Sequence, residues 1–313
     1  MAKEKSIVAN VFCILGKGIK LYFLNFEKFI KYMAFPIFGQ IIGITLVFAA
    51  AYVFTLKAPA LTSANPVFDN ILLVFLLLLL ISLPGFFIFT KAFWDYLIAM
   101  VSLNSMASTL AEGGTLDDVS VHDDMARKRS GSYVILLLLL AIITLIGLLP
   151  PFWLFMVYLT LTFQVFALED DISAPKAIAT SINLIKGNYA RTILLIFLLY
   201  VITYWLVPSL ICWGFEAGNL LGFFTYPVER FIDLLPFFDP NSGVTLPVAV
   251  ESREISRLIV LSTVSFAVTG FALPLRSVCC TMLYKELYSN NYAGKIAAEK
   301  LVKRARTPKI KED

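Results

Sequence analysis

The stretch FALEDDISAPKAIATSINLIKGNYAR, from Phe166 to Arg191, interrupts the central hydrophobic part of the chain and carries the signals of a complete helix. Ser173 is a favourable N-cap residue, Pro175 is tolerated in a first helical turn, and Gly187 can end the helix. Its residues divide into an apolar face and a polar face, which predicts an amphipathic helix at a membrane surface, between two spans. The apolar face holds Ala174, Ala177, Ile178, Ser181, Ile182 and Ile185, and the polar face holds Lys176, Thr180, Asn183 and Lys186.

The composition places this stretch in an all-α, polytopic membrane protein. The chain has 313 residues, of which 59% are hydrophobic and only 15% are charged, and its mean hydropathy is +0.81. So few charged groups do not cover the surface of a soluble globule. We therefore expect six transmembrane helices, arranged as three hairpins, because each apolar run is near the ~20 residues that a bilayer core requires. The predicted spans are residues 30–54, 71–90, 133–149, 151–168, 192–213 and 255–284.

The three hairpins enter the membrane through similar segments. These are KLYFLNFEKFIKYM, ARKRSGSYVILLLL and LIKGNYARTILLIF, each with a basic residue near an apolar run. All three lie before odd-numbered spans, so a repeat would be a parallel one, about an axis normal to the membrane. Generic interface chemistry produces such similarity about as readily as duplication does.

Two flanking regions complete the predicted domain plan. Residues 1–29 form an amphipathic helix on the cytoplasmic side, lying in the membrane plane or extending the first span. Residues 30–284 form the six-span membrane domain, and residues 285–313 a basic tail that ends in a short helix. After Lys91 we expect the second span to continue as a helix until Gly113 and Gly114. The segment 55–70 is predicted to be a loop, Pro150-Pro151 a tight hairpin, and 214–252 an interfacial or re-entrant external segment.

The distribution of basic residues predicts the orientation. With both termini cytoplasmic, 22 of the 26 Lys and Arg residues fall on the inner side, as the positive-inside rule requires. We expect a multi-pass protein of a bacterial inner membrane.

One motif resembles a known family. A motif between residues 169 and 192 is similar to that of bacterial membrane proteins related to the glycerophosphoryl diester phosphodiesterase membrane domain. Its residues are Glu169, Ala177, Ser181, Leu184, Lys186, Gly187, Asn188, Arg191 and Thr192. The ending LPLRSVCCTMLYKELYSN is also similar to that family. The resemblance implies a six-helix membrane module without the catalytic domain.

The sequence lacks the usual signatures of an enzyme. His122 is the only histidine and lies in a predicted loop between aspartates, and we expect neither a Ser-His-Asp set nor a histidine-rich metal site. Adjacent carboxylates such as Asp170 and Asp171 are more often helix caps than Mg²⁺ ligands. The four cysteines lie in or beside apolar runs and are interpreted as packing residues. We expect no cofactor and no metal. We also expect no nucleic-acid partner, because the basic tail has no interleaved aromatic residues on which bases could stack.

The charges near the inner ends of the spans suggest one candidate site. Glu169 lies at the inner end of the predicted fourth span and Arg276 at the inner end of the sixth, so the two would meet if both side chains turn inward. Lys91, Asp95 and Gln164 would complete a polar cluster that faces the cytoplasm. The alternative is that both residues only mark where their spans leave the membrane. The predicted function is a non-enzymatic module that binds lipids, which we expect to be anionic, or partner membrane proteins. A transporter or permease-like component is the alternative, and a lipid-modifying enzyme is a distant third.

Overall fold

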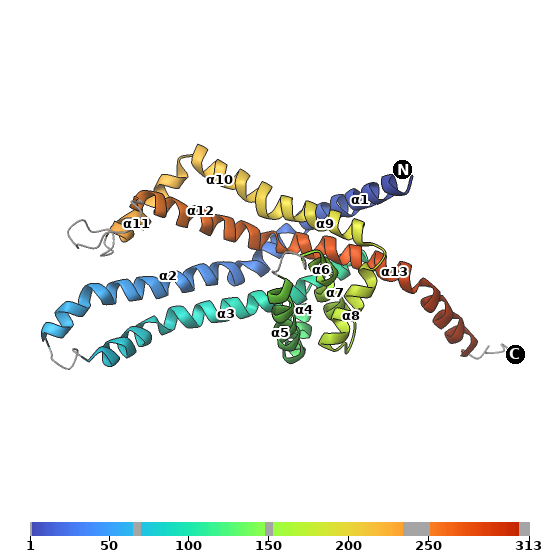
Figure 1. The fold of residues 1–313 in the computed structure, drawn as a ribbon, viewed down its shortest axis with the longest axis horizontal. Coiled ribbons are helices and arrows are strands. Elements are labelled where there is room, and N and C mark those ends of the chain that lie inside the picture. Colours follow the sequence, from blue (N-terminus) through green and yellow to red (C-terminus); the bar gives the residue numbers. More distant parts are fainter. Residues whose placement is uncertain (1, 65–69, 148–152, 234–250, 307–313) are drawn as a thin grey trace. The chain divides into compact units, whose positions relative to one another are not determined.

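The computed structural model of the protein describes residues 2–64, 70–147, 153–233 and 251–306. Every regular element in these ranges is a helix, which confirms the all-α class (Figure 1). Six helical segments are long and apolar enough to cross a membrane, in agreement with the predicted number: Ile7–Leu24, Phe26–Phe54, Ile71–Ala111, Ser130–Gly147, Tyr189–Ala217 and Ser252–Asn291. The structure is that of a multi-pass membrane protein.

Five of the six segments overlap predicted spans, and the sixth, Ile7–Leu24, was not predicted as a span, whereas the predicted span 151–168 is not among the six. Helix α1 (Ala2–Leu24) is itself apolar enough to span, although its sequence favoured an in-plane helix. The predicted span 151–168 is divided, where described, into α6 (Trp153–Met156), the 3₁₀ helix η3 (Val157–Leu159) and α7 (Thr162–Leu168). The Thr160 hydroxyl donates to the Val157 carbonyl over 2.7 Å, and such local bonds compete with a continuous helix. At 1.5 Å per residue, Val157–Leu168 rises only about 18 Å, which is short of a ~30 Å bilayer core.

The helices extend further than the apolar runs alone indicated. Helix α2 (Phe26–Ala64) continues through most of the segment predicted as the loop 55–70. Helix α3 (Ile71–Ala111) continues past Lys91, as predicted, and Gly113 follows its end with a φ of +84°. Helix α12 (Ser252–Phe271) is followed by α13 (Leu273–Arg306), a single helix that includes the predicted tail helix. The predicted turn at Pro150-Pro151 lies outside the described residues.

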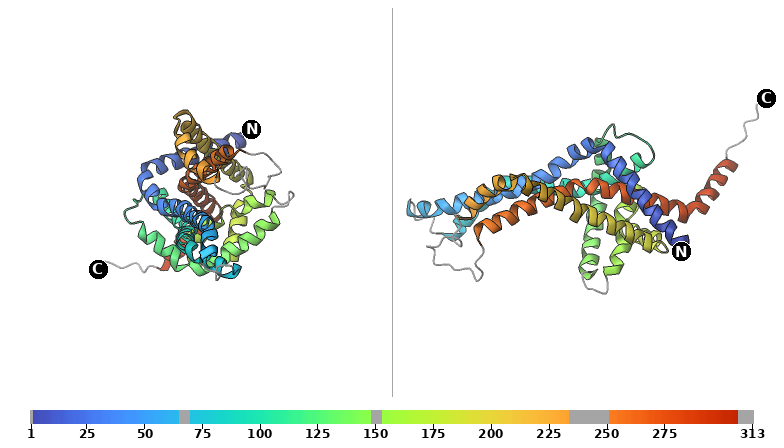
Figure 2. Two further views of the ribbon diagram at one scale, coloured as in Figure 1. Left: turned by 90° about the vertical axis from the view of Figure 1, so that its left-hand side faces the viewer. Right: turned by 90° about the horizontal axis from the view of Figure 1, so that it is seen from above.

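The chain forms two compact units. Unit 1 comprises residues 1–28, 97–197 and 274–313, and unit 2 comprises residues 29–96 and 198–273. Unit 1 contains α1, the end of α3, α4 (Ser120–Lys128), α5 (Ser130–Gly147), the segment from α6 to α8 (Ala174–Ile185), α9 (Tyr189–Tyr200) up to residue 197, and α13. Helix α8 packs against α5, α7 and η3, and Figure 2 shows this group from two further sides.

Unit 2 is built around two close helix packings. Helices α2 and α3 run side by side, and at Gly43 and Gly85 their backbones approach so closely that a Cβ on Gly43 would lie 2.5 Å from the backbone nitrogen of Phe89 (Figure 1). Small residues permit such approaches between membrane helices. Helix α12 packs against α10 (Val207–Ala217) and α11 (Leu220–Asp233). The rest of the predicted external segment, 234–250, lies outside the described residues.

Helix α8 has the bounds that its sequence predicts. Ser173 is its N-cap residue with extended backbone angles, and Gly187 follows its end with a φ of +89°. Ala174, Ala177 and Ser181 are buried, whereas Lys176 and Lys186 are exposed. Ile185 of the apolar face is buried as well, whereas Ile178 is partly exposed and Ile182 is 39% exposed. Part of the apolar face therefore packs within unit 1, and part of it stays open. A position at the membrane surface stays a prediction.

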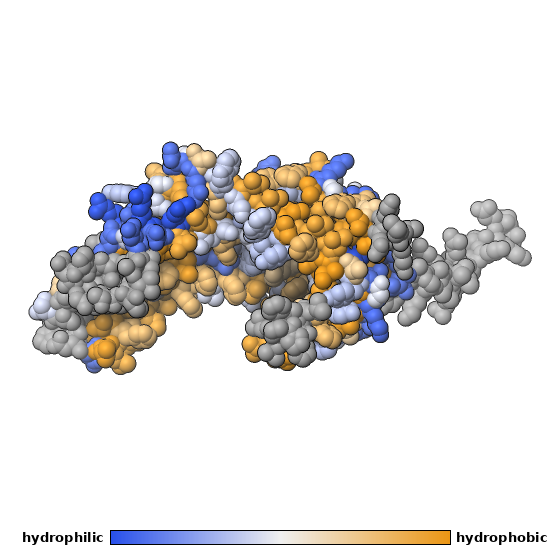
Figure 3. All heavy atoms as spheres, turned by 45° about the horizontal axis from the view of Figure 1, so that its top comes forward, coloured by the Kyte–Doolittle hydropathy of each residue, from blue (hydrophilic) through white to orange (hydrophobic). Residues whose placement is uncertain are grey.

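Large apolar side chains remain exposed along the candidate spans. Phe48, Leu80, Leu138 and Trp205 are each more than half exposed. Figure 3 shows hydrophobic residues, in orange, over much of one face of the molecule. Exposed apolar surface of this extent is typical of a lipid-facing protein surface.

Candidate functional site

Three consecutive residues of α13 connect the elements of unit 1. Tyr284, Lys285 and Glu286 each contact a different element, and Leu283 and Leu287 on either side are fully buried. Because successive residues of an α-helix point about 100° apart, the three side chains leave α13 in three directions. Helix α13 therefore contacts several elements of unit 1 at this level, and we call these three residues the α13 hub.

The first hub contact is made to Glu169, the residue that ends α7. The Tyr284 hydroxyl donates to Glu169 Oε1 over 3.3 Å, and Arg129 donates from Nη1 to the Glu169 carbonyl oxygen over 3.1 Å. The Arg129 guanidinium also lies 4.5 Å from the ring centre of Phe166, in a cation–π arrangement. Burial raises the pKa of Glu169 above its ordinary value, although the Tyr284 hydrogen bond and the nearby Lys176 oppose this shift.

The second contact pairs Glu286 with α9 and α1. Glu286 Oε2 forms an ion pair with Arg191 Nη2, and Asn10 donates to Glu286 Oε1 over 2.9 Å. The Arg191 side chain is 10% exposed, whereas Glu286 is 34% exposed. The Arg191 Nε is buried and has no hydrogen-bond partner among the described residues. Asn10 thereby joins α1 to this ion pair.

The third contact connects α13 to the end of α3. Lys285 Nζ lies 2.5 Å from Glu112 Oε1 and donates to the Ser108 carbonyl over 2.9 Å. Hydrogen bonding and the charge of Lys285 lower the pKa of Glu112. Lys285 thereby adds a second hydrogen bond to a carbonyl in the last turn of α3 that already accepts from the Glu112 backbone N–H over 3.1 Å.

The predicted polar cluster is divided between the two units. Glu169, Gln164 and Arg276 belong to unit 1, whereas Lys91 and Asp95 belong to unit 2. Lys91 and Asp95 pair with each other at 2.5 Å, one helical turn apart on α3. Glu169 contacts Tyr284, two turns beyond Arg276 on α13, so the pairing of Glu169 with Arg276 stays a prediction. Sequence reasoning missed Tyr284 as a partner because a tyrosine near a membrane boundary usually indicates interfacial anchoring.

Gln164 takes part in a different, buried contact. Its amide nitrogen donates to Asn104 Oδ1 over 3.3 Å, and both residues are buried. Asn104 in turn donates to the Met100 carbonyl over 2.8 Å. Paired amides in an apolar interior hold facing helices in register, because burying either amide without its hydrogen-bond partner would cost free energy.

The motif residues of 169–192 have structural roles. Ser181 donates from Oγ to the Tyr158 carbonyl over 2.7 Å and so fastens α8 to η3. Thr192 donates to the Asn188 carbonyl over 3.1 Å, within the first turn of α9. Ala177 and Leu184 are fully buried, and Lys186 is the C-cap residue of α8.

The single histidine lies on a helix that the sequence analysis did not foresee. His122 belongs to α4, and its Nδ1 is 2.9 Å from the Ser105 hydroxyl. Partial burial lowers the pKa of His122, against the opposing charge of Asp118. No group of three metal-ligating side chains occurs in the part of the chain that the structure describes.

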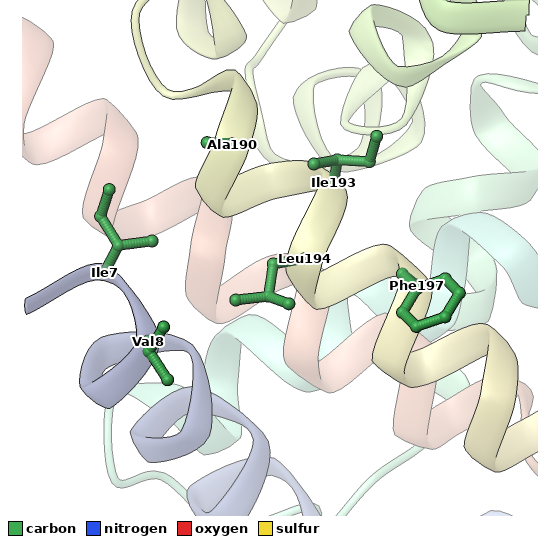
Figure 4. A pocket seen from close by; sticks show the side chains of 6 residues that line it. All are labelled: Ile7, Val8, Ala190, Ile193, Leu194 and Phe197. Atoms are coloured by element: carbon green, nitrogen blue, oxygen red, sulfur yellow. The ribbon is translucent and has the colours of Figure 1, made fainter. Parts of the chain in front are cut away.

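Two grooves open on the surface of unit 1. The first, of about 560 Å³, lies between α1 and α9, and every described residue lining it is apolar (Figure 4). Its lining residues are Ile7, Val8, Ala190, Ile193, Leu194 and Phe197. The second, of about 510 Å³, lies between α5, the α6–η3 segment and α8, and Lys186 is one of its lining residues.

Comparisons with known proteins give this chain no relative: no protein-family model, no curated protein and no solved structure matches it.

Proposed function

We propose that the protein is a membrane module of a bacterial inner membrane that binds membrane lipids, has both termini in the cytoplasm, and performs no catalysis itself. The observation that carries this proposal is the groove between α1 and α9 (Figure 4). Both helices are apolar enough to span, so the groove belongs to segments that the bilayer would surround. An acyl chain is the ligand that such a wholly apolar groove fits best.

The α13 hub supports a structural role for the charged groups. Glu286 of α13 pairs with Arg191 of α9, and Lys285 of α13 pairs with Glu112 at the end of α3, so these charges join elements of unit 1. The resemblance of the 169–192 motif to the phosphodiesterase membrane domain family is consistent with this reading. A binding partner among membrane proteins remains part of the proposal, since exposed apolar faces suit lipids and helices alike.

The proposal is tested by filling the groove. Leu194→Trp places an indole among the lining residues, whereas Leu210→Trp places the same group at a 58% exposed position of α10 outside both grooves. We expect the purified Leu194 variant to retain fewer lipid molecules in native mass spectrometry than the wild type and the Leu210 control. Equal retention by all three proteins would refute lipid binding in this groove.

Transport is the second candidate, and a helix interruption favours it. The π-helix η4 (Val201–Leu206) interrupts the apolar segment Tyr189–Ala217 just before Pro208, and interrupted helices often line transporter sites. Thr203, in this segment, is fully buried and donates to the Leu199 carbonyl over 2.8 Å. Reaction of Thr203→Cys with an impermeant thiol reagent would reveal a water-filled path and favour transport. Absence of a reaction at Thr203→Cys would favour the lipid-binding module.

A further inference from the structure

The second groove of unit 1 combines an apolar lining with one cation. Ile146, Phe155, Tyr158, Ile178 and Ile182 line it together with Lys186, and among the described lining residues Lys186 alone is charged. Phe155 and Ile146 are more than half exposed, so the groove is open along its length. Apolar walls with a single charge suit an amphiphile better than a wholly polar or wholly apolar ligand.

The lining residues of α8 are ordered along the groove. Ile178, Ile182 and Lys186 follow one another at steps of four residues, which places them on one stripe of the helix. Over these eight steps the helix rises about 12 Å. The stripe therefore leads from an apolar region to an ammonium group, in the order that an acyl chain and its headgroup would require.

Lys186 lies close to the boundary of a candidate span. It lies three residues before Tyr189, where the candidate span Tyr189–Ala217 begins. The rings of Tyr158 and Tyr189 lie 5.3 Å apart beside it, and tyrosines of this kind gather at the membrane–water interface. A lysine at the same level can reach a lipid phosphate while its aliphatic stem stays on apolar surface.

The charge of Lys186 is available to a ligand. Its side chain is exposed, and among the described residues no carboxylate lies within ion-pair distance of it. The alternative role is local, because a cation at the C-terminal end of α8 also offsets the helix dipole. The helix-dipole role would affect stability without any effect on lipid choice, so an experiment can separate it from lipid binding.

We propose that this groove binds one anionic phospholipid, with an acyl chain along Ile178 and Ile182 and the phosphate at Lys186. This inference rests on the proposed function for the membrane setting and adds a site that selects the lipid by charge. Attraction between Lys186 and a net negative headgroup strengthens binding by about fivefold over a zwitterionic lipid.

The experiment uses the full chain, purified in detergent, freed of lipid and titrated with equal amounts of phosphatidylglycerol and phosphatidylcholine. Native mass spectrometry counts each bound lipid for the wild type, Lys186→Gln and the control Lys176→Gln. Lys176 is exposed on the same helix but does not line the groove. A further variant, Ile182→Trp, fills the apolar part and retains the lysine. Thermal unfolding without lipid is measured for all four proteins.

We expect the wild type and Lys176→Gln to prefer phosphatidylglycerol. Lys186→Gln should lose about fivefold in its affinity for that lipid alone, and Ile182→Trp should bind both lipids more weakly. Retained preference in Lys186→Gln overturns the inference, and a lowered melting temperature in that variant would then assign the lysine to the helix dipole. Equal binding of both lipids by the wild type overturns the inference but leaves the proposed function standing. Absence of any bound lipid overturns the proposed function itself.

Discussion

The hydroxyl of Tyr284 donates a hydrogen bond to Glu169 over 3.3 Å and joins α13 to the end of α7. Because burial raises the pKa of Glu169, the folded protein binds more protons than the unfolded chain between the ordinary and the raised pKa. The free energy of unfolding therefore falls as the pH rises through this window. Glu169→Gln carries no charge, so we expect it to lose less stability than the wild type between about pH 5 and about pH 7.5.

Thermal unfolding in detergent at both pH values checks this expectation. Asp170→Asn removes the neighbouring exposed carboxylate and should keep the pH dependence of the wild type. Identical pH dependence in Glu169→Gln and the wild type would show that Glu169 is not desolvated by its contacts.

The ion pair between Arg191 and Glu286 should be strongly coupled. Glu286→Ala leaves the buried Arg191 without its counter-charge, at a cost of about 1.5–3 kcal/mol in the free energy of unfolding. The double variant Arg191→Met with Glu286→Leu should cost less than the two single changes together, because it leaves no charge alone. Glu216→Ala breaks the exposed pair with Arg257 and should cost at most about 1 kcal/mol. Additive single effects would show that Arg191 and Glu286 do not stabilise the fold as a pair.

The close approach of α2 and α3 at Gly43 predicts an intolerance to alanine. The Cβ of Gly43→Ala would lie 2.5 Å from the Phe89 nitrogen and 2.8 Å from the Gly85 carbonyl oxygen, and backbone atoms cannot rotate away. We expect a loss of about 1–3 kcal/mol in stability. Gly16→Ala, on α1 with open space around it, should instead stabilise by up to about 1 kcal/mol. Equal effects of both changes in denaturation experiments would contradict the packing of α2 on α3.

The charge distribution predicts which loops face the cytoplasm. In a chain whose four cysteines are replaced, Ser63→Cys at the end of α2 should react with an impermeant thiol reagent on intact cells. Asp117→Cys, between α3 and α4, should react only after the cells are opened. Labelling of Asp117→Cys in sealed cells would invert the orientation.

Local sequence patterns predicted where helices begin and end better than they predicted which helices contact one another. Ser173, Pro175 and Gly187 set the bounds of α8, and Gly113 the end of α3, because caps and breakers act within a few residues. Hydropathy could not distinguish a span from a surface helix for α1, nor reveal that Thr160 interrupts the segment before α7. The α13 hub joins residues more than a hundred positions apart, such as Glu169 and Tyr284, and no short-range pattern contains that information.

The central claim, that unit 1 binds lipid in defined grooves, is tested most directly by photochemical labelling. The protein in vesicles is exposed to a phospholipid with a photoreactive group on its acyl chain, and labelled residues are mapped by mass spectrometry. The account predicts label concentrated on the two groove linings, such as Ile193, Leu194, Ile178 and Ile182, and lost from the first groove in Leu194→Trp. Label spread evenly over equally exposed apolar positions, such as Leu138 and Leu210, would contradict it.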